Sequence, residues 1–62
     1  MDREYDVFEI FPDGTHIWRA FVRGLVDARA RVVELSEGSA NEFYAIHTPT
    51  KEVVANARKH WE

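Results

Sequence analysis

The sequence predicts a small α+β fold, in which two β-hairpins flank one helix in the order ββαββ. Two strand-like runs meet at Pro12-Asp13-Gly14, residues 25–37 carry apolar side chains at helical spacing, and a second pair of strand-like runs meets at 48–51. We expect one antiparallel sheet with the helix packed on one face. A chain of 62 residues makes a single domain, 1–62, with a core over about 4–57 and a tail over 58–62.

The first hairpin is predicted over 5–22. Residues 5–11 are mostly aromatic or β-branched, as strands prefer, and the turn follows directly. Proline presets φ for the first turn position, and glycine tolerates the left-handed conformation that ends a three-residue hairpin loop. Pairing Phe11 with Thr15 sets the register of both strands. The opposed pairs on one face are then Ile10 with His16, Phe8 with Trp18, and Asp6 with Ala20.

The helix is predicted over 25–37, after Gly24 breaks the strand alternation. Its apolar positions recur every three or four residues and the opposite positions are charged, so one stripe packs on the sheet while the other meets water. Gly38 is placed to end the helix. The apolar positions are Leu25, Ala28, Val32 and Leu35, and the charged ones are Asp27, Arg31 and Glu34.

The second hairpin is predicted from residue 42 onward, but its C-terminal segment has two interpretations. As a helix, the segment starts at Thr50, a suitable N-cap, because Val53, Ala57 and Trp61 recur every four residues. As a strand, residues 52–55 return along 42–47. The opposed pairs are then Ile46 with Val53, Tyr44 with Ala55, and His47 with Glu52. The pattern favours the strand and leaves the helix open.

Composition and charge restrict the classes of function. Eight Lys and Arg against eleven Asp and Glu give a net charge of -3, which disfavours nucleic-acid binding driven by phosphate contacts. The charged N-terminus precedes no long apolar segment, so we expect neither a signal peptide nor a membrane span, and we expect a cytoplasmic protein. The chain has no cysteine, so disulfides cannot supplement a thin core, and association with a second copy is the expected supplement.

The residue types that usually carry catalysis or metal binding form no recognisable pattern. His16, His47 and His60 lie in different predicted segments without ligand spacing, so no metal is expected. The glycines are isolated at element boundaries and form no phosphate-binding loop, so no cofactor is expected. Ser36 and Ser39 lie at the predicted helix end, where capping and turn formation are their expected roles. We therefore expect a protein that is not an enzyme.

The candidate functional surface is the second face of the first hairpin. In the predicted register Phe8 and Trp18 lie beneath the helix, while Glu9 lies on the uncovered face, in solvent and diagonal to Arg19. Apolar side chains beside arginines are typical of protein interfaces, so we expect a homodimer interface there. The alternative function is single-stranded nucleic-acid binding, with aromatic rings on bases and arginines on phosphates. The expected interface residues are Tyr5, Ile17, Arg19, Phe21 and Arg23.

Several strings of this sequence resemble those of short bacterial single-domain proteins to which no activity is assigned. They consist of turn and core residues and span nearly the whole chain. The strings are 8–15 (Phe-Glu-Ile-Phe-Pro-Asp-Gly-Thr), Trp18-Arg19, Gly24-Leu25, Asn41-Glu42-Phe43 and 50–54 (Thr-Lys-Glu-Val-Val). The resemblance implies a free-standing bacterial domain of ββαββ pattern, and it implies no chemistry.

Overall fold

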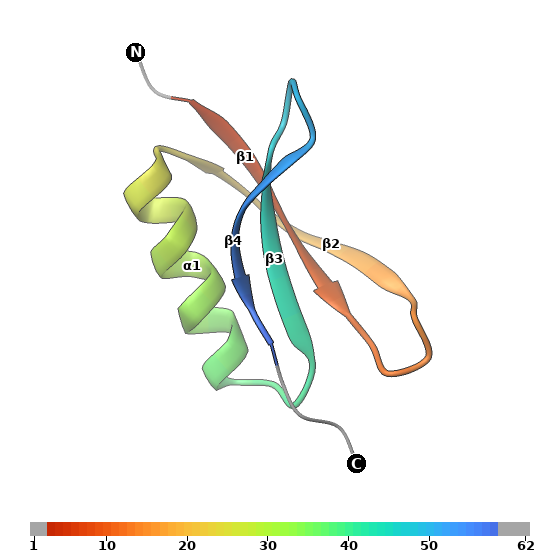
Figure 1. The fold of residues 1–62 in the computed structure, drawn as a ribbon. Helices are drawn as coiled ribbons and strands as arrows, with labels where there is room; N and C mark the ends of the chain where they lie inside the picture. The colour runs from red at the N-terminus through yellow and green to blue at the C-terminus, as the bar shows by residue number, and fades with distance from the viewer. Residues whose placement is uncertain (1–2, 59–62) are drawn as a thin grey trace.

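The computed structural model describes residues 3–58, and it confirms the α+β fold with the ββαββ order (Figure 1). The elements are β1 (Glu4–Ile10), β2 (His16–Arg23), α1 (Leu25–Glu37), β3 (Glu42–His47) and β4 (Glu52–Ala57). The helical interpretation of the C-terminal segment is wrong, because β4 pairs with β3 along its length. The predicted tail beyond Arg58, including Trp61, lies outside the described residues.

The sheet has four strands in the order β2-β1-β3-β4, and every neighbouring pair is antiparallel. The two hairpins therefore join through their first strands, β1 and β3, which occupy the centre. The helix α1 lies on one side of the sheet and contacts all four strands (Figure 1). This leaves the opposite side of the sheet without a covering element among residues 3–58.

The core lies between α1 and the two central strands. Along β1 the burial alternates with the period of two that a strand imposes, so Tyr5 and Val7 are buried and their neighbours are partly exposed. These side chains pack with Phe43 of β3 and with Val32 of α1. Small residues complete the contact surface, namely Ala20, Ala28, Ala45, Ala55 and Ala57. They allow the helix to approach the sheet closely.

The two hairpin turns follow from local sequence. The predicted pairing of Phe11 with Thr15 is confirmed, since the Phe11 N–H donates to the Thr15 carbonyl over 2.9 Å. Gly14 has a φ of 91°, which only glycine adopts without strain. At the second turn the Lys51 N–H donates to the His47 carbonyl over 2.7 Å. Lys51 has a φ of 64°, a left-handed conformation that costs free energy for a residue with a Cβ.

Each edge strand contains one β-bulge, and both bulges change the predicted register. In β2, Ala20 pairs with Val7 and Trp18 pairs with Phe8, so Arg19 is the extra residue. In β4, Val54 is the extra residue between two consecutive pairings with β3. The predicted pairs of Ile10 with His16, Phe8 with Trp18, Ile46 with Val53 and His47 with Glu52 are confirmed, whereas Asp6 pairs with Phe21 and Tyr44 with Asn56 rather than with the predicted alanines.

The prediction of which sheet face the helix covers is wrong. Tyr5 and Val7 lie beneath α1 with exposed fractions of 2% and 0%, whereas Trp18, predicted to be core, is 54% exposed. Both faces of the first hairpin are apolar, so periodicity alone does not distinguish them. The alanines of the sheet share the face of Tyr5 and Val7, and a helix packs more closely there than over a row of aromatic rings.

Candidate functional site

The candidate site is the uncovered side of the sheet, which we call the open face. Strand register places two rows of side chains across all four strands on this face, each with one residue from each strand, and a third row across β2, β1 and β3. The open face is apolar and rich in aromatic rings, with Trp18 54%, Phe21 47% and Val53 53% exposed. Its apolar side chains are Phe8, Ile10, Trp18, Phe21, Tyr44, Ile46 and Val53.

The aromatic rings of the open face pack against one another across strands. The rings of Phe8 and Tyr44 stack with centroids 5.3 Å apart and an interplanar angle of 14°. The ring of His16 meets Tyr44 edge-on at 5.6 Å, and its Nδ1 shares a 2.9 Å hydrogen bond with the Tyr44 hydroxyl. Burial raises the pKa of Tyr44. These contacts restrict the conformations that the rings can adopt.

A carboxylate lies in the middle of this apolar surface. Asp6 is on the central strand β1, between Phe21 of β2 and Ile46 of β3. Its Oδ1 accepts a hydrogen bond from Trp18 Nε1 and its Oδ2 accepts one from Thr48 Oγ1, each over 3.2 Å. Asp6 therefore orients the exposed indole ring, and it adds a negative charge to the open face.

The open face contains a surface cavity with lining residues from all four strands. Its volume is about 350 Å³, near the lower limit of pockets that hold small ligands. Apolar side chains of β1, β3 and β4 form much of its wall, and the polar lining residues include the carboxylate of Glu42. The lining includes Ile10, His16, Tyr44, Val53, Asn56 and Arg58.

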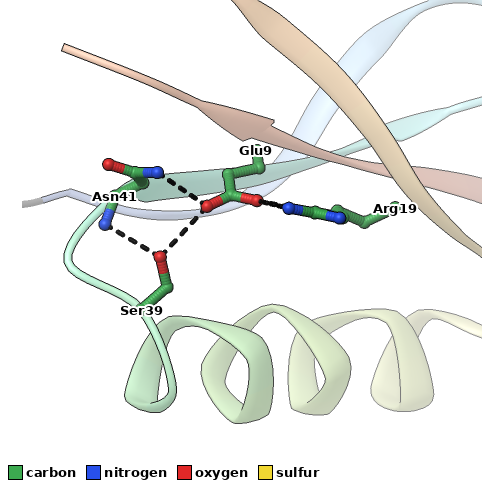
Figure 2. A network of polar contacts seen from close by, with 4 residues as sticks. All are labelled: Glu9, Arg19, Ser39 and Asn41. Atoms are coloured by element: carbon green, nitrogen blue, oxygen red, sulfur yellow. Dashed lines mark hydrogen bonds and ion pairs between the residues drawn. The ribbon is translucent and has the colours of Figure 1, made fainter.

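A buried carboxylate network lies on the opposite, helix-covered side (Figure 2). Glu9 is 4% exposed, and it forms an ion pair with Arg19, whose Nε donates to Oε1 over 2.6 Å. Ser39 Oγ and Asn41 Nδ2 both donate to Oε2, over 3.0 and 2.8 Å. Burial alone raises the pKa of Glu9, but the bonds from Asn41, Arg19 and Ser39 outweigh it, so this pKa lies below its ordinary value.

This network corrects two predictions. The contact between Glu9 and Arg19 exists, but Glu9 is buried rather than in solvent, because α1 covers the sheet face that carries Glu9. Ser39 donates to Glu9 and accepts from the Asn41 N–H over 3.1 Å, so its hydroxyl joins the α1–β3 loop to β1 as well as forming a turn. Three side chains therefore donate hydrogen bonds to the Glu9 carboxylate and connect β1 to β2 and to the α1–β3 loop.

The five predicted interface residues do not form one surface. Tyr5 is buried in the core, Ile17 is opposite Glu9 on the helix side, and Arg19 is bound by Glu9. Phe21 and Arg23 do lie on the open face, where their register partners are Asp6 and Glu4.

The residues that sequence reasoning missed as surface groups are Phe8, Trp18 and Tyr44. Alanine is enriched on the opposite face, but Ala20 joins that face only because of the bulge at Arg19.

Within residues 3–58 no cluster of three or more His, Cys, Asp or Glu side chains is placed to hold a metal ion. The single helix in that range is too short and too polar to cross a membrane. No protein-family model, curated protein or solved structure matches the chain.

Proposed function

We propose that this protein is a small, non-enzymatic interaction module that forms a homodimer by stacking the open faces of two copies. One observation carries the proposal: an aromatic, largely apolar sheet face has no covering element among the described residues. Monomeric proteins rarely leave such a contiguous patch in water. A bacterial cytoplasm as its setting stays a prediction from the sequence.

Face-to-face stacking suits the dimensions of the open face. Two packed sheets lie about 10 Å apart, with side chains from both faces filling the layer between them. Four strands of about six residues give a projected area of roughly 400 Å², and the relief of the aromatic rings adds to it. Specific interfaces bury about 800 Å² on each partner. The dimer is therefore expected to be reversible and to depend on protein concentration.

Pairing through the sheet edges is a less suitable mode. An edge strand recruits another strand through a row of free backbone groups, and a bulge interrupts that row. Both edge strands are bulged, β2 at Arg19 and β4 at Val54. Arg19 also remains 45% exposed beside this edge, where a charged side chain opposes edge pairing. These features favour association through the face.

The alternative function, single-stranded nucleic-acid binding, has less support. Exposed aromatic rings suit base stacking, and Trp18 and Phe21 are such rings. However, Arg19 is bound to Glu9, and the Asp6 carboxylate lies in the centre of the face, where it repels phosphates. The overall charge of -3 has the same effect. Self-association is therefore the function that the charges favour.

The test compares a charge placed on the open face with the same charge placed elsewhere. Phe21→Glu puts a carboxylate on the open face, and Val26→Glu puts one on α1, where Val26 is 79% exposed. Light scattering after size exclusion, over a tenfold concentration range, is expected to show dimers for wild type and Val26→Glu and monomers for Phe21→Glu. Circular dichroism verifies that each variant is folded.

Either of two results would contradict the proposal. The first is a wild-type protein that stays monomeric at the highest concentration. If that monomer also retains a fluorescent single-stranded oligonucleotide at low salt, the open face binds nucleic acid instead. The second is a Phe21→Glu variant that is as dimeric as wild type, which would place the interface elsewhere.

A further inference from the structure

We infer that the Trp18 side chain of each copy docks into the surface cavity on the open face of the other copy. This inference rests on the proposed self-association and specifies its geometry. The cavity and the exposed indole ring lie on the same face: Trp18 is on the edge strand β2, and the cavity extends from His16 of β2 to Val53 and Asn56 of the other edge strand, β4. A surface that carries both an exposed apolar group and a cavity for it is self-complementary, as a two-fold symmetric interface requires.

One two-fold symmetric arrangement of stacked sheets produces this docking. A two-fold axis parallel to the strands, running between two stacked sheets, reverses the order β2-β1-β3-β4. It therefore places β2 of one copy over β4 of the other, and β1 over β3. Stacked sheets keep their strands within about 30° of parallel, so the residue rows stay nearly in register.

In the stacked pair, the row of side chains that contains Trp18 faces the same row of the other copy, in the opposite order. Its members across the sheet are Trp18, Phe8, Tyr44 and Asn56. Reversal places each Trp18 over Asn56 of the other copy, and each Phe8 over Tyr44. Asn56 and Tyr44 line the cavity. This one symmetry operation thus places the indole ring of each copy at the cavity of the other copy.

The indole ring also fits the cavity in size and chemistry. The cavity of about 350 Å³ has apolar walls from Ile10 and Val53, and it exceeds the volume of one indole ring. Trp18 is 54% exposed and is the bulkiest of the exposed apolar side chains in the described range. Its N–H is held by Asp6, so the ring is oriented before association. Buried, preoriented aromatic side chains are the usual centres of binding energy in interfaces.

The neighbouring row supports the same arrangement. Its members are Phe21, Asp6, Ile46 and Val53. Reversal places Phe21 over Val53, two apolar groups that are about half exposed in one copy. It places Asp6 over Ile46 rather than over a second Asp6, so no two carboxylates oppose each other in this row.

The experiment uses two variants that are defective in complementary ways. Trp18→Ala removes the docking group and keeps the cavity, whereas Val53→Trp keeps the docking group and fills the cavity. Each variant alone is expected to dimerise at least about 30-fold more weakly than wild type, the size of a typical hot-spot truncation. Mixed in equal amounts, they are expected to form a heterodimer more tightly than either forms a homodimer, because one docking pair is then intact.

Native mass spectrometry resolves the heterodimer, because the two variants differ in mass. The control is Val33→Trp, which adds the same side chain at a position on α1 that is 55% exposed, and it is expected to dimerise like wild type. Two results would overturn the docking while leaving self-association intact. In the first, Val53→Trp dimerises as tightly as wild type. In the second, both variants are weakened but show no preference for each other. A monomeric wild type would instead overturn the proposed function.

Discussion

Removing Arg19 tests whether the buried Glu9 network holds the bulged sheet together. Arg19→Ala takes an ion pair and a 2.6 Å hydrogen bond from a carboxylate that is 4% exposed. Hydrogen bonds to charged groups contribute about 1.5–3 kcal/mol. Because the Arg19 side chain is 45% exposed, solvent screens the pair. We therefore expect a loss near the lower limit, about 2 kcal/mol, and a fall in Tm of roughly 8–16 °C.

The matched control is the other arginine ion pair of the described residues. Arg31 has a side chain that is 47% exposed, and its Nε lies 3.9 Å from Glu34, which is 74% exposed. Exposed pairs of this kind contribute less than about 0.5 kcal/mol. Urea denaturation of both variants at one protein concentration is expected to show a loss several times larger for Arg19→Ala than for Arg31→Ala. Equal losses would refute the reasoning that burial of Glu9 makes its partner important.

The pH dependence of the free energy of unfolding provides a second test of the same prediction. The pKa of Glu9 in the folded chain lies below its ordinary value of 4.5. Its ionisation therefore contributes stability that is fully present above pH 4.5 and is lost as the pH falls through the lowered pKa. Without Arg19, two of the causes that lower this pKa disappear while the burial that raises it remains. As the pH falls, the free energy of unfolding is therefore expected to decrease less in Arg19→Ala than in wild type, and to decrease as much in Arg31→Ala as in wild type.

Two further predictions concern the second turn and the open face. Lys51→Gly is expected to raise the free energy of unfolding by about 0.5–1 kcal/mol, because Lys51 has a φ of 64°. Urea denaturation measures this change, with Lys51→Ala as the control. An unchanged urea midpoint for Lys51→Gly would contradict the prediction. Asp6→Asn keeps an acceptor for Trp18 and a partner for Thr48 but removes a charge that stacking would bury. We expect its dimer Kd to be about tenfold lower, as measured by sedimentation equilibrium at neutral pH, and weaker dimerisation would count against burial of Asp6 in the interface.

Sequence alone determined the elements of this fold, because each depends on neighbours along the chain. Pro12-Asp13-Gly14 specifies a tight hairpin loop whatever the strands later pack against. The helix at 25–37 follows from its own periodicity and from the glycines at either end, and its observed bounds are the predicted ones. The turn at 48–51 is compatible with a return strand, and the pairing of β4 with β3 confirms that strand.

Only tertiary structure decided which face of the sheet became a surface. Side chains alternate strictly along a regular strand, so a single bulge at Arg19 moves Phe21 to the other side, and no residue pattern marks that bulge in advance. The choice between two apolar faces depended on how closely α1 approaches the alanines of three strands, a sum over residues far apart in the chain. The burial of Glu9 depended likewise on donors at 19, 39 and 41. The candidate interface is therefore a property of packing between elements, whereas the elements themselves are properties of the local chain.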